Sequence, residues 1–165
     1  MSSRKPSSIA TKIVATFAIA ALSLSAFAGR YWRGATDDAL FSNTENWATS
    51  SGGAGGNSYP GQNGDESTTY YRNYLNGLCV IDGAYTVPGD VDIGTASSSY
   101  FVWRANASTS GITTTGSFVL GYDAKNPNYL EIDGGTYSFG GTVRIGYNAD
   151  NTVGLVFKGD SFTGN

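Results

Sequence analysis

The clearest pattern along the chain is an alternation of apolar and polar residues that returns with a period of 25. Residues 116–140 align without gaps on residues 141–165, and seven of the 25 aligned pairs are identical. Phe118-Val119-Leu120 aligns with Val143-Arg144-Ile145, so the outer positions stay apolar while the middle one changes freely. A variable position between two apolar ones is typical of a strand with one buried face.

The same comparison predicts two more short strands in each copy. Leu130-Glu131-Ile132 aligns with Leu155-Val156-Phe157, and Tyr137-Ser138 aligns with Phe162-Thr163. Glycines follow the first two strands of each copy, where a chain that turns a corner needs backbone angles that other residues disfavour. The identical pairs are Gly116/Gly141, Gly121/Gly146, Tyr122/Tyr147, Ala124/Ala149, Asn126/Asn151, Leu130/Leu155 and Gly134/Gly159.

One 25-residue copy cannot bury its own apolar face, so we expect the copies to stack with like strand over like strand. The pattern therefore predicts an all-β fold, a single-stranded parallel β-helix (β-solenoid) built from residues 78–165. The array runs to Asn165, and we expect the solenoid to be truncated at this C-terminal end.

Upstream of the clear copies the repeat is more degenerate. Residues 91–94 resemble residues 118–121 at an offset of 27, and residues 101–103 predict a second strand of the same earlier coil. Residues 78–81 and 84–87 flank an Asp-Gly pair and predict two further strands, either a hairpin or a first coil.

Residues 1–28 have the organisation of a secretory signal peptide. Three basic residues precede an apolar run over residues 13–28, which ends in the small-x-small pattern Ala26-Phe27-Ala28. The rival interpretation, a membrane anchor, needs about 20 apolar residues, and this run is shorter and contains three hydroxyl residues. We expect an exported protein, secreted or at the cell surface, cleaved near Ala28.

Composition agrees with an exported β-rich protein. Only 14 % of the residues are charged, against 23 glycines and 11 tyrosines, which favours short strands and tight turns. Cleavage after Ala28 leaves seven basic and 13 acidic residues, a net charge of −6, which argues against nucleic acid as a partner. Cys79 is the only cysteine and lies in an apolar stretch, so a small buried hydrophobe is favoured over a reactive thiol.

The sequence offers little for catalysis. It contains no histidine, which excludes Ser-His-Asp and Cys-His schemes and the usual zinc ligand sets. β-Helical lyases and hydrolases need calcium-binding acids or paired carboxylates, and the candidate pairs are Asp90 with Asp92, Asp123 with Asp150 and Asp133 with Asp160. The Asp123 and Asp133 columns change to Asn148 and Lys158 in the next copy. Asp90 and Asp92 favour turn chemistry over a metal site. We expect no enzyme, metal or cofactor in this chain.

Residues 29–77 precede the repeats, and we expect them to cap the first coil, because an open end exposes apolar interior and unpaired strand edges. The segment contains a glycine-rich loop over residues 51–56 and an ordered set of motifs: Trp32, Gly34, Phe41, Ser42, Asn46, Trp47, Pro60, Gly61 and Asp65, followed by Ile93-Gly94, Leu120-Gly121 and Ile145-Gly146. This order resembles the N-terminal part of large secreted bacterial β-helical repeat proteins, of the autotransporter-like and planctomycete-verrucomicrobial types. The resemblance implies a β-helical chain longer than this one.

Four aromatic residues are candidates for a site. Trp32 and Trp47 either cover the first coil or form an exposed platform on which pyranose rings stack. Tyr122 and Tyr147 occupy the same repeat position, so they form either a packed ladder or a ligand-binding stripe. The packing interpretation is favoured for both pairs.

Together these patterns predict an exported, noncatalytic structural or adhesive β-solenoid at the cell surface or in the extracellular matrix. The alternatives are a carbohydrate-binding module and the N-terminal fragment of a β-helical polysaccharide lyase or hydrolase. Expected partners are extracellular polysaccharide or cell-surface components. Self-association through the open solenoid end, around residues 155–157, is expected as well.

Overall fold

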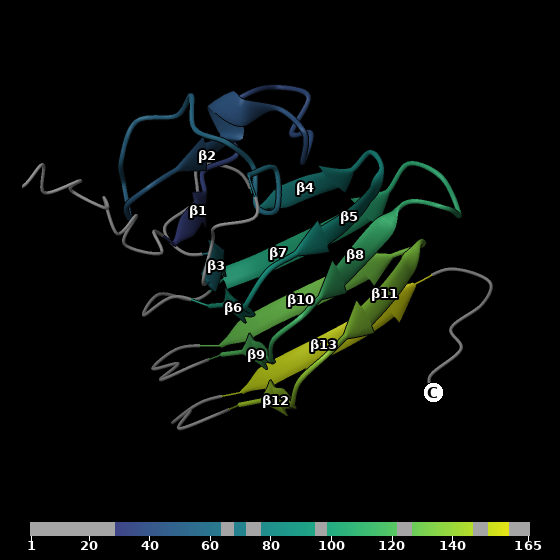
Figure 1. Ribbon diagram of the computed structural model, residues 1–165. Coiled ribbons are helices and arrows are strands. Elements are labelled where there is room, and N and C mark those ends of the chain that lie inside the picture. Colours follow the sequence, from purple (N-terminus) through teal and green to yellow (C-terminus); the bar gives the residue numbers. More distant parts are fainter. Residues whose placement is uncertain are drawn as a thin grey trace, which may run out of the picture.

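The computed structural model describes residues 29–63, 68–71, 77–94, 99–121, 127–146 and 152–158. These residues form thirteen strands and one short 3-10 helix, η1 (Thr44–Asn46), so the predicted all-β class is confirmed (Figure 1). None of the helical structure in the described ranges has the length and hydropathy that a bilayer span requires.

The strands form three sheets (Figure 1). Sheet A has the order β12 (Val143–Ile145), β9 (Phe118–Leu120), β6 (Asp90–Ile93), β3 (Thr68–Tyr71), β1 (Arg30–Trp32) and β2 (Trp47–Ala48). Sheet B has the order β13 (Val153–Lys158), β10 (Asn128–Asp133), β7 (Ser99–Ala105) and β4 (Leu78–Ile81). Sheet C has the order β11 (Thr136–Phe139), β8 (Gly111–Thr114) and β5 (Ala84–Val87).

From β4 onward the chain visits sheets B, C and A in turn, and we call one such passage a turn of the stack. Like strands of successive turns pair in parallel, with Val91 opposite Phe118, Phe118 opposite Val143 and Leu130 opposite Leu155. These pairs have the offsets of 27 and 25 that the repeat predicts, so the predicted register is confirmed. Parallel sheets built in this way are consistent with a β-solenoid.

The hairpin alternative for residues 78–81 and 84–87 is wrong. The two segments are strands β4 and β5, but β4 pairs with β7 in sheet B and β5 pairs with β8 in sheet C. Asp82 and Gly83 therefore form a corner between two sheets. Cys79 and Ile81 on β4 and Val87 on β5 are buried in the shared interior, which a flat two-stranded hairpin would leave half exposed.

The core consists of the inward side chains of the three sheets. Cys79 on β4 is fully buried, which confirms its interpretation as a buried hydrophobe. Trp103 stacks on Tyr137, with ring centroids 5.6 Å apart, and Phe118 packs against Phe139 at 4.6 Å. Each fully buried large side chain of this kind contributes about 1.5–3 kcal/mol through burial.

Glycines occupy the corner that follows sheet A in each turn. Gly94, Gly121 and Gly146 follow β6, β9 and β12 and have φ values of 147°, 74° and 74°. A side chain is strained at such angles. The predicted corner role of the repeated glycines is confirmed at this column.

The segment before β4 closes the edges of all three sheets at the N-terminal end of the stack. Strand β2 pairs antiparallel with β1 and ends sheet A. Leu40 forms a bridge to Val80, and the Phe41 N–H donates to the Val80 carbonyl at 2.8 Å, which covers the β4 edge of sheet B. Gly61 lies against β5 of sheet C, so closely that a Cβ there would be 2.0 Å from the Thr86 carbonyl oxygen.

The motif residues of this segment hold one another in place. The Trp47 indole N–H donates to the Phe41 carbonyl at 2.7 Å, and the Asn46 side-chain amide donates to the Leu40 carbonyl at 3.0 Å. Ser42 donates through its hydroxyl to Asp82 at 2.5 Å, which connects the segment to the first corner of the stack. These motif residues thus form one packed layer over the first turn, and Asp65 lies outside the described residues.

Candidate ligand-binding groove

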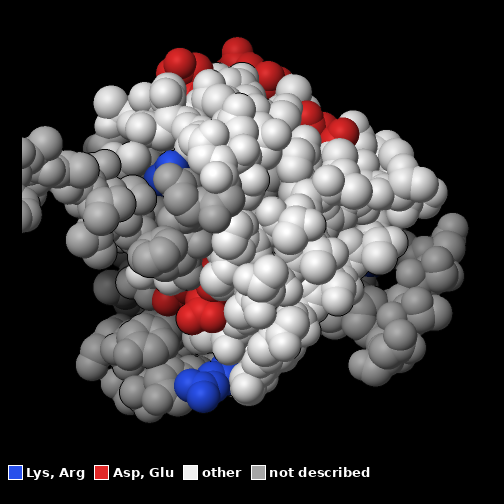
Figure 2. Space-filling model, viewed as in Figure 1, with Lys and Arg blue, Asp and Glu red and all other residues white. Residues whose placement is uncertain are grey.

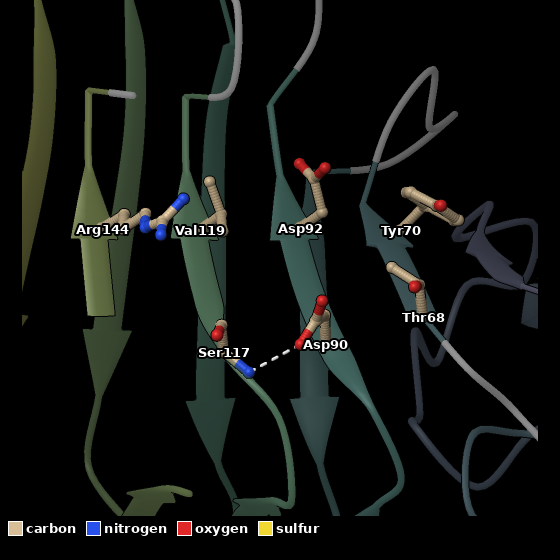
Figure 3. A pocket seen from close by; sticks show the side chains of 7 residues that line it. All are labelled: Thr68, Tyr70, Asp90, Asp92, Ser117, Val119 and Arg144. Carbon is tan, nitrogen blue, oxygen red and sulfur yellow. Dashed lines mark hydrogen bonds between the residues drawn. The ribbon is translucent and has the colours of Figure 1, made fainter. Parts of the chain in front are cut away.

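A groove of about 390 Å³ lies on the outer face of sheet A. Four strands contribute to it, and its lining mixes acidic, basic, hydroxyl and apolar side chains (Figure 3). The lining residues are Thr68, Tyr70, Asp90, Asp92, Ser117, Val119 and Arg144. In the space-filling view, acidic atoms lie in a hollow with basic atoms beside them (Figure 2).

The strand register brings these residues together. Tyr70 lies opposite Asp92, Asp92 opposite Val119, and Val119 opposite Arg144. Neighbouring strands are about 4.8 Å apart, so the four side chains form one row across β3, β6, β9 and β12. The row faces outward because the residues on either side of Asp92 on β6 are buried in the core.

Asp90 and Asp92 are two residues apart on β6 and face the same side (Figure 3). One carboxylate oxygen of Asp90 accepts a hydrogen bond from the Ser117 N–H at 2.7 Å. The bond joins β6 to the corner that precedes β9 in the next turn of the stack, 27 residues later, so it is a contact between turns, and local turn chemistry at Asp90 stays a prediction. Asp92 lies within the same strand, and both carboxylates line the groove.

Two residues of the row carry opposite charge. The guanidinium of Arg144 extends from β12 toward Val119, while the Asp92 carboxylate stands on β6 on the other side of Val119 (Figure 3). Carboxylates only accept hydrogen bonds and guanidinium groups only donate them. Together with the hydroxyls of Thr68 and Ser117, this arrangement suits a polar ligand that has both donors and acceptors.

Within the described ranges, no three acidic or cysteine side chains are grouped so that they could hold a metal ion. Asp133, from another candidate pair, forms an ion pair with Arg104 at 3.0 Å on the outer face of sheet B. The candidate partners Asp150 and Asp160, and Asp123, lie outside the described residues.

Of the four aromatic residues predicted as site candidates, the structure describes two, and both lie in the core. Trp32 and Trp47 are completely buried and meet edge to face, with ring centroids 5.1 Å apart. The alternative of a sugar-stacking platform is therefore wrong for these two residues, because neither indole face is open to a ligand. Tyr122 and Tyr147 lie outside the described residues.

The groove itself escaped prediction, although the sequence contained part of its signal. Asp92, Val119 and Arg144 occupy the free middle position of aligned strands, and the repeat already places them in one column. Tyr70 is 22 residues before Asp92, a spacing that matches neither 25 nor 27. Only the strand pairing reveals that it belongs to the same row.

A second charged surface lies on the outer face of sheet B, and its charges pair with one another. Glu131 accepts a hydrogen bond from the Tyr100 hydroxyl and forms an ion pair with Lys158 at 2.8 Å. The hydrogen bond from Lys158, followed by that from Tyr100, lowers the pKa of the Glu131 carboxyl. This surface therefore satisfies its charged groups internally.

No family model matches this chain, and searches of the curated proteins and of the solved structures found no protein with significant similarity. The resemblance to secreted bacterial β-helical repeat proteins accordingly stays a prediction from the order of its motifs.

Proposed function

We propose that this chain is an exported, noncatalytic structural or adhesive protein, in which residues 78–165 form a single-stranded parallel β-helix. The observation that carries the proposal is the register of the three sheets, in which each turn of the chain adds one strand to each sheet. A parallel stack grows by about 4.8 Å per turn. Such a stack gives a stiff rod whose length is set by the number of turns.

The N-terminal segment supports this proposal as a cap. The interlocked layer of Trp32, Phe41 and Trp47 occupies the position where a rod would otherwise expose its interior. The motifs that form this layer are the ones that resemble secreted β-helical repeat proteins. The signal-peptide pattern of residues 1–28, outside the described residues, supports export.

Two tests address this proposal separately. Cysteines at Thr113 and Ser138, which lie opposite each other on β8 and β11, are expected to form a disulfide on mild oxidation. Cysteines at Thr86 and Ser138 are the matched control, since they are two strands apart and should stay reduced. Equal oxidation of both pairs, seen by mass spectrometry, would contradict the β-helical register.

The second test follows export and catalysis. We expect the protein to reach the cell surface or the medium with Gly29 as its first residue, as read by N-terminal sequencing. Incubation with a panel of polysaccharides should release no reducing ends. Retention in the cytoplasm with residues 1–28 intact, or product release, would contradict the proposed function.

Carbohydrate binding is a second candidate function, and the groove on sheet A favours it. A groove of about 390 Å³ falls in the size range of small-ligand sites. Its carboxylates, hydroxyls and guanidinium can pair with sugar hydroxyls, and Val119 offers an apolar floor. A glycan array probed with the mature protein tests this function, and loss of the signal in a groove variant would locate it.

A further inference from the structure

We propose that the groove on sheet A recognises neutral pyranose sugars through two hydroxyl groups on adjacent ring carbons, a vicinal diol. This inference rests on the carbohydrate-binding function proposed above and names its ligand class. The binding groups are Thr68, Asp90 and Ser117, which line one part of the groove (Figure 3). Thr68 lies opposite Asp90 on the neighbouring strand, and the Ser117 N–H donates to Asp90 from the other side, so the three residues form one row.

The side chains of this row retain hydrogen-bonding capacity for a ligand. Within the part of the chain that the structure describes, the Asp90 carboxylate takes part only in the bond from the Ser117 N–H at 2.7 Å, and the hydroxyls of Thr68 and Ser117 take part in none. A carboxylate has about four acceptor sites, and a hydroxyl both donates and accepts. The row therefore offers an acceptor that is fixed by the backbone of the next turn, between two adaptable hydroxyl groups.

This combination of groups selects a neutral ligand that carries hydroxyls. The remaining acceptor sites of Asp90 require a donor, whereas the hydroxyls beside it can pair with a donor or an acceptor. Sugar hydroxyls are both, and two on adjacent ring carbons can reach Asp90 and one of its neighbours at the same time. Acidic sugars are disfavoured, because the groove holds the carboxylates of Asp90 and Asp92 against the single guanidinium of Arg144.

The apolar part of the groove supplies the other half of the match. Val119 follows Ser117 by two residues, and both side chains line the groove. Two residues of an extended strand span about 6.6 Å, so an apolar surface lies beside the polar row. A pyranose ring has a face of C–H groups and a rim of hydroxyls, so it can pack on Val119 while its rim reaches Asp90. A small ammonium ion would pair with Asp90 but leave the valine without a contact.

The experiment is affinity gel electrophoresis of the mature protein through dextran, galactomannan and xylan, which are neutral and carry vicinal diols. Each polymer is compared with the same polymer after periodate oxidation and borohydride reduction, which cleaves the carbon–carbon bond of a vicinal diol and leaves alcohols. We expect at least one polymer to retard the protein and its treated form to bind about tenfold more weakly, the size of one charge-assisted contact. A linear β-1,3-glucan, whose internal residues carry no vicinal diol, and alginate, which is acidic, should not retard it.

Variants locate the binding at the row. Asp90→Asn keeps an oxygen for the Ser117 N–H but replaces the other acceptor by a donor, so it should weaken binding of the retarding polymer about tenfold. Ser117→Ala keeps the N–H, removes the hydroxyl and should weaken binding about threefold. Thr113→Ala, a matched loss of an exposed hydroxyl on sheet C, should change nothing. The wild-type comparison needs no variant, so a folding defect in one of them does not remove the test.

The outcomes separate this inference from the function on which it rests. Equal retardation by a polymer and by its periodate-treated form, or retardation by alginate alone, would overturn the diol specificity and leave carbohydrate binding intact. No retardation by any of the neutral polymers would overturn the inference, and a silent glycan array in addition would overturn carbohydrate binding as well. Weakening by Thr113→Ala as strong as that by Asp90→Asn would place binding outside the groove and overturn the inference.

Discussion

The two ends of the stack contrast sharply. At the N-terminal end, Trp32 and Trp47 have no exposed surface, Leu40 bridges to the β4 edge of sheet B, and Gly61 lies against β5 of sheet C. At the opposite end, Val143 and Ile145 on β12 are 47 % and 49 % exposed, and Phe157 on β13 is 42 % exposed. Both ends contain apolar strands of the same type, and among the described residues a covering layer is seen only at the N-terminal end.

The repeat makes this contrast quantitative, because equivalent positions occur in both environments. Phe118 and Leu120 in the middle of the stack are fully buried, whereas Val143 and Ile145, one turn later, are about half exposed. The residue types and strand geometry are alike. Burial here depends on whether a neighbouring layer is present and is not a property of the residue alone.

The largest loss of stability should come from a substitution in the layer that covers the N-terminal end of the stack. Trp47→Ala removes a buried indole and its hydrogen bond to the Phe41 carbonyl, and we expect it to lower the free energy of unfolding by about 3–5 kcal/mol. Urea unfolding followed by fluorescence measures this. Tyr100→Ala, at a half-exposed tyrosine on sheet B, is the control and should cost less than about 1 kcal/mol. Unchanged stability of the Trp47 variant would rule out a capping role.

Matched truncations at one repeat position sharpen the comparison. Leu120→Ala should cost about 2–5 kcal/mol because it leaves a cavity between two neighbouring turns. Ile145→Ala, one turn later and half exposed, should cost less than about 1 kcal/mol. Equal losses in chemical denaturation would mean that the last turn is as tightly covered as the middle of the stack.

The exposed apolar end should also mediate self-association. We expect light scattering to show a mass that rises with protein concentration, because exposed apolar strands attract one another. Charges placed at the exposed positions, as in Ile145→Lys with Phe157→Lys, should return the protein to a monomer. A wild-type protein that is monodisperse and monomeric at high concentration would contradict this expectation.

The reactivity of the Cys79 thiol measures directly how well the N-terminal end of the stack is covered. Burial raises the pKa of this thiol well above its usual value, so at pH 8 it should react slowly with a disulfide reagent in the native protein. In guanidinium chloride it should react fully. Trp47→Ala is expected to speed native labelling several-fold, since the cap lies over the first turn. Rapid labelling of native wild-type protein would show that this end is not closed.

The smallest effect concerns the ion pair that joins the last two strands of sheet B. Lys158 lowers the pKa of the Glu131 carboxyl, so the pair stabilises the fold above the unfolded pKa of about 4.3 and loses this effect as pH falls through the lower folded value. Lys158→Gln should raise the pKa of Glu131 toward its ordinary value in an NMR titration. An unshifted titration would show that β10 and β13 are not paired as described.

Much of the fold could be predicted from the sequence because the repeat encodes it locally. The strand Phe118–Leu120 and its partner one turn later follow from alternation, and their register follows from the period of 25. The corner glycines follow from the backbone angles that a turn requires. The hairpin alternative arose because Asp82-Gly83 is also a good two-residue turn, and local sequence does not distinguish the two geometries.

The site could be predicted only in part, because the residues that meet there are far apart in the sequence. An exposed tryptophan and a buried one have the same sequence signature, so the position of Trp32 and Trp47 depended on which layer covers them. The groove needed the pairing of β3 with β6, which no repeat indicates. The residues that vary most between copies, such as Arg144, proved to be the ones that line it.

The outward row of sheet A has a consequence for how such a surface can change. It carries a tyrosine, an aspartate, a valine and an arginine on successive strands, while from β6 to β12 the neighbours on either side stay apolar and the register is kept. The backbone thus places outward side chains at intervals of about 4.8 Å. The four positions of this row hold four different types of side chain. Substitutions at these outward positions can therefore change the surface one residue at a time without changing the backbone.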